Sequence, residues 1–281
     1  MKYRHDFHAG NFADVHKHIV LLALLRAQQR KDKGFLHLDT HAGRGRYDLA
    51  GHATQHGAEA ALGIDLLEAA VARSDEIRHY LATVNTWRQQ YDQARGYPGS
   101  PLLAAIQLRP QDRGICCELQ PPEFRMLERS LAAQSRMRAE CADGYAQLRA
   151  LLPATERRAL LLIDPPYEDS AQEFNRAGEA LQTALQRQAN AVIALWYPIK
   201  DERSLAPWLQ RMASSLGAPT LQSELWLHPR DSRVALNGSG LLIVNPPYQF
   251  DDAMSDWLPE LAKLLGAGAH GGSAQHWLVH E

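Results

Sequence analysis

The sequence predicts an α/β fold built on a mostly parallel sheet, with an antiparallel hairpin at the sheet edge and a helical insertion. Short, almost continuous apolar runs alternate with helical segments through most of the chain, which is typical of parallel strands buried on both faces. Two later strand-like runs follow one another without a helix between them, so we expect them to pair antiparallel. Residues 51–95 interrupt the alternation.

The chain begins with a predicted helix and strand. Val15, Ile19, Leu22 and Leu25 recur at helical spacing, which predicts a helix over residues 13–29. The run FLHLD at 35–39 is a short strand, and the glycine-bearing THAGRGRY follows it directly. A strand followed by such a turn is typical of the first unit of a nucleotide-binding sheet.

The interrupting segment is rich in Ala, Leu, Glu and Arg, and we expect residues 51–95 to be helical throughout. We interpret it as an insertion within a single domain that spans residues 1–281. The alternation then resumes. The predicted strands are 114–119, 138–143, 159–164 and 191–198, and the predicted helices are 121–135, 144–151, 170–188 and 202–216. The hairpin strands TLQSELWLH and SGLLIVNPPY, a further helix and the run AQHWLVHE complete the chain.

Composition narrows the class of protein. The chain of 281 residues is 45% hydrophobic, enough for a sizeable core, and its net charge of −2 argues against coating nucleic acid by bulk charge. Three cysteines, two of them adjacent in an apolar run, suit buried free thiols in a reducing compartment. No window approaches a membrane span. We therefore expect a cytoplasmic protein without membrane partners. We also expect a monomer, and no metal, because the N-terminal histidines lack Cys partners and a matching ligand spacing.

Two stretches look alike, LLIDPPYED at 160–169 and LLIVNPPYQF at 241–250. One shared tetrapeptide is weak support for an internal repeat, and the second copy follows the antiparallel hairpin. We therefore place the chemistry at Asp164, whereas Asn245 is expected only to end a hairpin strand.

Acidic side chains stand at the carboxyl ends of four successive predicted strands, where ligands bind in open parallel sheets. Burying each of them is costly unless it meets a hydrogen-bond donor. They are Asp39, Glu118, Asp143 and Asp164.

A nucleoside supplies suitable donors. Glu118 can accept both ribose hydroxyls and Asp143 an adenine amino group, while Gly43 and Gly45 allow a close backbone approach. HAGRGRY is a poor match to the pyrophosphate-binding G-x-G-x-x-G pattern. An adenosine-containing ligand without phosphates is therefore favoured.

The fourth strand end predicts the reaction. An exocyclic amine on a base is a weak nucleophile, and both the Asp164 carboxylate and the Pro165 carbonyl can accept its hydrogens. The two prolines fix the turn, and Tyr167 is expected to offer a face on which an extruded base stacks. This set of groups suits methyl transfer to a planar amine.

The order of LDTHAGRG, CCEL, ADGY and IDPPY resembles class I S-adenosylmethionine-dependent methyltransferases, which have a Rossmann-like fold. YRHDFHAGNFADVHKH, FLHLDTHAGRGRY, YPGSP, ALWYP and NPPY together resemble the bacterial 23S ribosomal RNA (adenine-N6)-methyltransferase family over essentially the whole chain. The resemblance implies that the cofactor is S-adenosylmethionine, that Asp164 is catalytic and that Tyr3 contacts RNA. It also implies donor contacts by His18, His41, Ser100, Glu118, Asp143, Gly144 and Asp164.

Further residues are candidates on their chemistry. Lys17 with His18 is expected to meet the carboxylate of the methionine moiety, and a solvated helix end is the alternative. Arg4 beside Tyr3 pairs a cation with an aromatic ring, which suits RNA.

Structural interpretations stay open for several of these residues. Glu118 and Asp143 can each simply cap a helix, and YPGSP can be a rigid turn. Arg44 and Arg46 can contact RNA or lie on a solvated face. A DNA adenine methyltransferase and an inactive ribosome-assembly factor that keeps the donor pocket are the rival functions.

Overall fold

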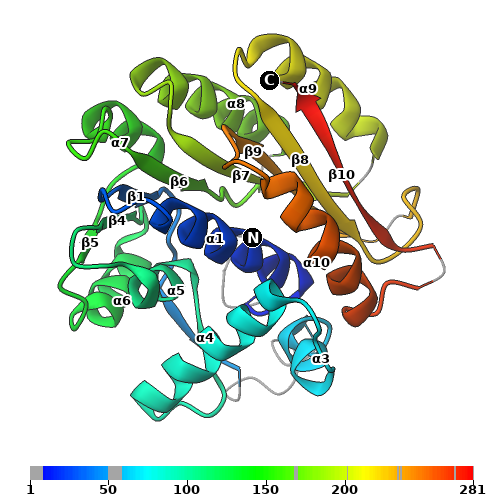
Figure 1. The fold of residues 1–281 in the computed structure, drawn as a ribbon, viewed down its shortest axis with the longest axis horizontal. Helices are drawn as coiled ribbons and strands as arrows, with labels where there is room; N and C mark the ends of the chain where they lie inside the picture. The colour runs from blue at the N-terminus through cyan, green and yellow to red at the C-terminus, as the bar shows by residue number, and fades with distance from the viewer. Residues whose placement is uncertain are drawn as a thin grey trace.

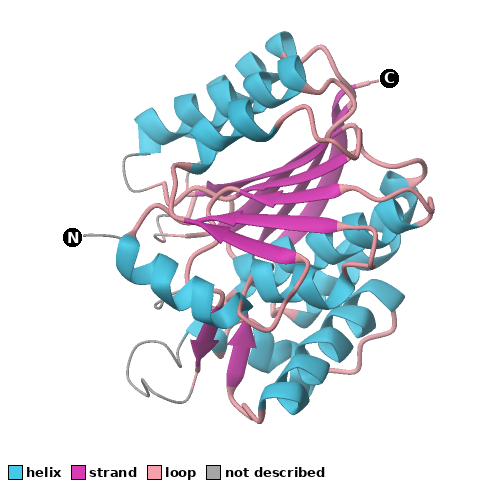
Figure 2. Ribbon diagram, turned by 90° about the vertical axis from the view of Figure 1, so that its left-hand side faces the viewer, coloured by secondary structure: helices cyan, strands magenta, loops and turns pink. Residues whose placement is uncertain are grey.

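The computed structural model describes residues 9–49, 59–167, 170–200, 202–232, 234, 236–268 and 270–280. An eight-stranded sheet lies between two layers of helices, and its strand order is β10-β8-β9-β7-β6-β1-β4-β5 (Figures 1 and 2). The strands are β1 (Leu36–Asp39), β4 (Arg113–Cys117), β5 (Met137–Glu140), β6 (Ala159–Ile163), β7 (Val192–Ile199), β8 (Thr220–Trp226), β9 (Gly238–Val244) and β10 (Gly272–Val279).

The first five strands of this sheet along the chain are parallel, as predicted. β1 pairs with β4 on one side and with β6 on the other, so the strand order reverses beside β1. Near-continuous apolar runs in β4, β6 and β7 are buried on both faces because helices cover each side. The Rossmann-like α/β fold expected from the sequence is confirmed, and the reversal beside β1 is where such folds bind ligands.

The late strands form the expected antiparallel hairpin, but that hairpin does not form the sheet edge. β9 pairs antiparallel with β7 and with β8. β10 then pairs antiparallel with β8, and it is β10 that lies at the edge. The hairpin is not at the edge because the C-terminal run AQHWLVHE contributes a further strand, which pairs with β8.

Two apolar clusters fill the space between the layers. One joins α1, α4, α5 and α10 to one face of the sheet, and the other joins α7, α8 and α9 to the opposite face. In Figure 1, α1 (blue) and α10 (orange) both lie on the face turned to the viewer. The helices are α1 (Phe12–Gln29), α3 (Ile64–Ala69), α4 (Asp75–Tyr91), α5 (Ser100–Gln107), α6 (Pro121–Leu131), α7 (Gly144–Leu151), α8 (Ser170–Arg187), α9 (Glu202–Ser215) and α10 (Phe250–Leu264).

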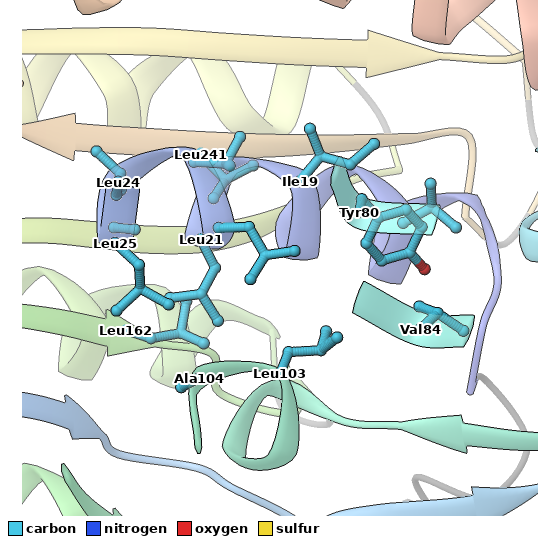
Figure 3. Close-up of a cluster of buried hydrophobic side chains, with 14 of the residues drawn as sticks. Ile19, Leu21, Leu24, Leu25, Tyr80, Val84, Leu103, Ala104, Leu162 and Leu241 are labelled. Carbon is cyan, nitrogen blue, oxygen red and sulfur yellow. The ribbon is translucent and has the colours of Figure 1, made fainter. Parts of the chain in front are cut away.

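Helix α1 is central to the first cluster. The Asn11 side chain caps its start by accepting the backbone N–H groups of Ala13 and Asp14 at 3.0 and 2.9 Å. The helix is apolar on most sides, which suits a helix covered all round. Figure 3 shows its leucines packed between the sheet and the helices α4 and α5.

The prediction of a continuous helix over residues 51–95 is wrong. Residues 50–58 lie outside the described part of the chain, and residues 70–74 separate α3 from α4. A small two-stranded sheet of β2 (Arg46–Asp48) and β3 (Gly96–Pro98) was also not predicted. Ala, Leu and Glu favour helix locally, but Ser74 precedes a new helix start, and helix propensity alone does not place such a break.

The three cysteines are free, with Cys116 and Cys117 buried in β4. Cys141 is exposed, so the expectation of buried thiols fails at this residue. No helix among the described residues is long and apolar enough to cross a membrane.

Candidate active site

The four acidic residues singled out in the sequence stand at the carboxyl end of the parallel strands. Asp39 is the last residue of β1, whereas Glu118 and Asp164 directly follow β4 and β6. Asp143 comes after the end of β5 and caps α7. Because β1 lies between β4 and β6, the carboxylates of Asp39, Glu118 and Asp164 come from adjacent strands.

The turn after β1 is held by its neighbours. The backbone N–H groups of Thr40 and Ala42 donate to the carbonyls of Leu162 and Cys117, at 3.0 and 2.9 Å. Gly43 has φ of 60°, a left-handed conformation in which glycine is unstrained, and its N–H donates to Glu118 Oε2 at 3.0 Å. The turn is therefore fixed before any ligand arrives.

Asp39 is fully buried beside this turn. Its Oδ2 accepts the Ser100 hydroxyl at 2.6 Å, and its Oδ1 accepts the His41 backbone N–H at 3.2 Å. Burial raises the pKa of Asp39 to about 7, and the hydrogen bond from Ser100 opposes that rise. Ser100 is the first residue of α5, a helix that was not predicted because YPGSP was interpreted as a turn.

Glu118 is buried between two backbone donors. Its Oε1 accepts the Gln120 N–H at 2.7 Å and its Oε2 accepts the Gly43 N–H at 3.0 Å. Burial raises the pKa of Glu118, and these two hydrogen bonds act against the rise. A carboxylate has about four lone-pair sites, so each oxygen can accept one more hydrogen, as a ribose diol requires.

Asp143 is a helix cap, the plainer of its two interpretations. Its Oδ1 accepts the Tyr145 N–H at 2.9 Å, and its Oδ2 lies 3.7 Å from a guanidinium nitrogen of Arg176. The side chain is still 41% exposed, so the cap leaves it within reach of a ligand. A Cβ on Gly144 would lie 2.0 Å from the Thr40 carbonyl oxygen, so glycine is needed where α7 meets the first turn.

His41 lies on the open side of this turn and is half-buried. Its Nδ1 is 2.8 Å from the Thr40 hydroxyl, and its ring meets the ring of Tyr145 edge-on at 4.8 Å between centroids. His41 therefore adjoins both the first turn and the start of α7.

Asp164 is paired with Lys17 of α1. The Lys17 ammonium donates to Asp164 Oδ2 at 2.5 Å and to Asp14 Oδ1 at 2.8 Å, and the side chains of Lys17 and Asp164 are both buried. Burial alone would lower the pKa of Lys17, but the charges of Asp14 and Asp164 raise it above the ordinary value. Lys17 is thus bound to the predicted catalytic carboxylate, and it is not the solvated helix end that was the alternative.

Tyr167 does not offer the open stacking face expected of it. Its side chain is 2% exposed, and its hydroxyl donates to the Trp196 carbonyl at 2.8 Å. The ring packs against Phe174 and Trp196, with centroids 4.7 and 5.7 Å away. The left-handed backbone at Tyr167, with φ of 50°, accompanies this inward position.

His18 is also turned into the protein. Its Nδ1 is 2.9 Å from the Tyr97 hydroxyl, which lies 3.0 Å from the Tyr80 hydroxyl, and all three side chains are buried. His18 lies next to Lys17 in sequence, but the structure gives it this separate set of partners.

The second DPPY-like stretch lies at the opposite end of the sheet. β9 is antiparallel to β7, and Val244 pairs with Ile193 near the start of β7. The Asn245 side chain donates to the Ala189 and Ala191 carbonyls, at 2.8 and 2.9 Å. Asn245 therefore ends a hairpin strand, as expected, and lies at the other end of the sheet from Asp164.

The remaining candidate residues are the proposed RNA contacts. Tyr3 and Arg4 lie outside the described residues. Arg44 forms a two-point ion pair with Glu123, at 2.7 and 2.8 Å, and Arg46 is exposed. Within the described ranges, no group of three or more potential metal ligands occurs.

Sequence reasoning missed two partners of the Lys17–Asp164 pair. Asp14 lies one helical turn before Lys17, a spacing at which opposite charges meet on a helix. Trp196 lies in the ALWYP run, and its ring centroid is 5.8 Å from the Lys17 nitrogen. The i, i+3 spacing could have revealed Asp14, whereas Trp196 is brought near only by pairing between β6 and β7.

The chain is similar to known proteins over most of its length. Residues 32–279 match the family model described as ribosomal RNA large subunit methyltransferase D, RlmJ. The chain is 37% identical to ribosomal RNA large subunit methyltransferase J of Escherichia coli K12 and 34% identical to that of Haemophilus influenzae, over the full length of each. A crystal structure of a Legionella pneumophila protein is 32% identical, with a TM-score of 0.83 over 96% of this chain and 97% of that one.

Proposed function

Because the chain belongs to the RlmJ family of large-subunit ribosomal RNA methyltransferases, we propose that it methylates the 6-amino group of an adenine in 23S ribosomal RNA, with S-adenosylmethionine as donor. The observation that carries the proposal is the position of Asp164. Its carboxylate ends β6 beside the reversal in strand order, with one oxygen held by Lys17.

The residues present fit the donor. Glu118 can accept the ribose hydroxyls with lone pairs left over from Gly43 and Gln120. Asp143 is exposed enough to accept from the adenine amino group, and the turn at Gly43 allows a close backbone approach. When bound, S-adenosylmethionine supplies a methyl group already activated as a sulfonium, so positioning and charge complementarity carry the catalysis.

Asp164 and Pro165 hold the acceptor amine. Lys17 binds Oδ2 of Asp164, and Oδ1 is left to accept one amino hydrogen. The Pro165 carbonyl accepts the other, and these two acceptors direct the nitrogen lone pair out of the base plane. The negative charge of Asp164 also stabilises the positive charge that develops on the amine, so no strong base is needed.

The other predicted residues take indirect or outlying roles in this proposal. Ser100 orients Asp39 through its hydroxyl, and Tyr167 holds the turn after β6 through its bond to Trp196. His41 flanks the donor from the first turn, and His18 supports α1 through its contact with Tyr97. Tyr3 and Arg4 bind RNA.

The proposal extends to the organisation of the chain. It is one methyltransferase domain over residues 1–281, with the segment 51–95 inserted in it. It acts as a monomer in the cytoplasm, where ribosomal RNA is its partner, and it uses no metal.

The experiment is a transfer assay with radiolabelled S-adenosylmethionine. The acceptors are 23S ribosomal RNA and genomic DNA from cells that lack the enzyme. We expect methyl transfer to RNA only, with N6-methyladenosine as the product after nuclease digestion. Transfer to DNA would favour the DNA adenine methyltransferase, and donor binding by calorimetry without transfer to either acceptor would favour the inactive assembly factor.

A further inference from the structure

Burial of Tyr167 leaves the acceptor base without the aromatic face that the DPPY turn was expected to provide. Its ring is covered by Phe174 and Trp196, and its hydroxyl is bound. Trp196 is different because its side chain is only half-buried. We propose that the indole of Trp196 is the face against which the acceptor adenine packs, an inference that rests on the proposed function.

The register of the sheet places Trp196 beside Asp164. Ile163, the last residue of β6, pairs with Leu195 of β7, so the next residues, Asp164 and Trp196, lie at the same level on adjacent strands. Neighbouring strands are about 4.8 Å apart. The carboxylate and the indole are therefore close enough to contact one base.

Both side chains also lie on the same face of the sheet. Leu162 and Ala194 belong to the cluster packed against α1, and side chains alternate along a strand, so Asp164 and Trp196 point to that face too. The position of Lys17 agrees with this direction, because its ammonium bonds to Asp164 and lies 5.8 Å from the indole centroid.

β7 extends beyond the end of β6, next to the site. It continues from Trp196 to Ile199 after β6 has ended, a projection of about 13 Å at roughly 3.3 Å per residue. β9 pairs with β7 along this projection, up to Ile199 opposite Gly238. Trp196 is the first residue of this projecting part of β7, where a flat group held by Asp164 would contact it.

The indole is held through the hydrogen bond of its Nε1, and the Lys17 ammonium lies over its ring. Trp196 Nε1 donates to the Ser239 hydroxyl at 3.0 Å, and that oxygen lies 3.0 Å from His16 Nδ1. His16 Nε2 is in turn 2.9 Å from the Ser223 hydroxyl. This chain of contacts ties the indole to α1 and to the strands β8 and β9. A preoriented ring loses little conformational entropy when a base packs on it.

The test uses two replacements of Trp196 and transfer to 23S ribosomal RNA. Trp196→Met keeps apolar volume without a ring, and Trp196→Phe keeps a ring without the Nε1 donor. Stacking of a base on an aromatic ring predicts a loss of kcat/KM for RNA of about tenfold or more for Trp196→Met, with a smaller loss for Trp196→Phe. Donor affinity, measured by calorimetry with S-adenosylmethionine, should be unchanged in both.

Tyr248→Ala is the matched control, because Tyr248 is 82% exposed and lies beyond β9 at the opposite end of the sheet. It should leave RNA kinetics unchanged. Equal kcat/KM for Trp196→Met and the parent would overturn the inference while leaving the proposed function intact. A parent that transfers no methyl group to RNA would overturn both.

If Trp196→Met does not fold, the same comparison is made with Trp196→Phe and Ser239→Ala. Both variants should raise KM for RNA at constant donor affinity, and unchanged KM in both would refute the inference.

Discussion

The ammonium of Lys17 lies 2.5 Å from Asp164 Oδ2, and both side chains are buried. This contact joins α1 to the strand end that carries the proposed chemistry. Two carboxylates, Asp14 and Asp164, accept from the one ammonium. The pair also fixes the rotamer of Asp164 before the base arrives.

Lys17→Met should destabilise the fold, because it leaves the buried Asp164 carboxylate without its ammonium partner. Breaking a buried ion pair by removing one partner costs about 3–5 kcal/mol, and urea unfolding should show a loss of that order. Adding Asp164→Asn should recover part of the stability, since the buried carboxylate that has lost its ammonium is then neutralised. Equal unfolding midpoints for Lys17→Met and the parent would mean that the contact contributes nothing to stability.

Asp164→Ala should leave a folded domain and lower methyl transfer by about 100-fold to 10,000-fold, the usual range for a positioned polar group at the reacting atom. Asn245→Ala is the control in the second DPPY-like stretch, and we expect its turnover to stay within a few-fold of the parent because Asn245 lies at the far end of the sheet. Single-turnover transfer to RNA measures both. Loss of turnover only in Asn245→Ala would assign the chemistry to the other stretch.

Glu118→Gln and Glu118→Ala separate donor binding from folding. Both should raise KM for S-adenosylmethionine more than they lower kcat, because contacts to the ribose are alike in the ground and transition states. Glu118→Ala leaves the N–H groups of both Gly43 and Gln120 without this acceptor, whereas the one amide oxygen of Glu118→Gln can still accept from one of them. Losing the acceptor of the buried Gly43 N–H costs about 1–3 kcal/mol. A drop in kcat at unchanged donor KM would give Glu118 a different role.

The fold was predictable because apolar periodicity is local. The strands β1, β4, β6 and β7 all lie within the predicted runs, to within one or two residues. The predictions that failed concern strands whose positions depend on contacts between distant parts of the chain. β2 and β3 are each three residues long and pair across the interrupting segment, and β10 becomes the edge strand only by pairing with β8.

The acids of the site were predictable for a similar reason, since each follows a strand and strand ends are visible in the sequence. The surroundings of each acid were not. Whether Tyr167 points outward depends on Phe174 and Trp196, which belong to α8 and β7. The pairing of Lys17 with Asp164 joins residues 147 positions apart, and no local pattern marks it.

Tyr3 and Arg4 should bind RNA through an aromatic ring and a cation. Replacing both by Ala should lower kcat/KM for RNA by about tenfold or more, since stacking on a base contributes about 1–3 kcal/mol and a phosphate contact adds to it. Affinity for S-adenosylmethionine by calorimetry should not change. RNA kinetics equal to the parent would leave these residues without an RNA role and direct the search to the segment 51–95.

His37 should make the protein sensitive to acid. It is fully buried in β1, and among the described residues its ring makes no hydrogen bond of good geometry, with only a poorer contact to the Leu160 backbone. Burial lowers the pKa of His37 to about 4, below the value of about 6.5 in an unfolded chain. Between these two values the unfolded chain binds the extra proton, so stability falls as the pH falls from about 6.5 to 4.

His37→Leu removes this titration and buries an apolar group instead. At pH 8 the variant should be as stable as the parent or more so, because an apolar side chain has no unpaired nitrogen to desolvate. At pH 4 it should exceed the parent by on the order of 3 kcal/mol, at 1.36 kcal/mol for each unit of pKa difference. Urea unfolding at a series of pH values measures both. His16, whose pKa burial lowers to about 3, keeps titrating in the variant, so part of the acid slope must persist. An acid slope as steep as that of the parent would show that His37 is not a source of it.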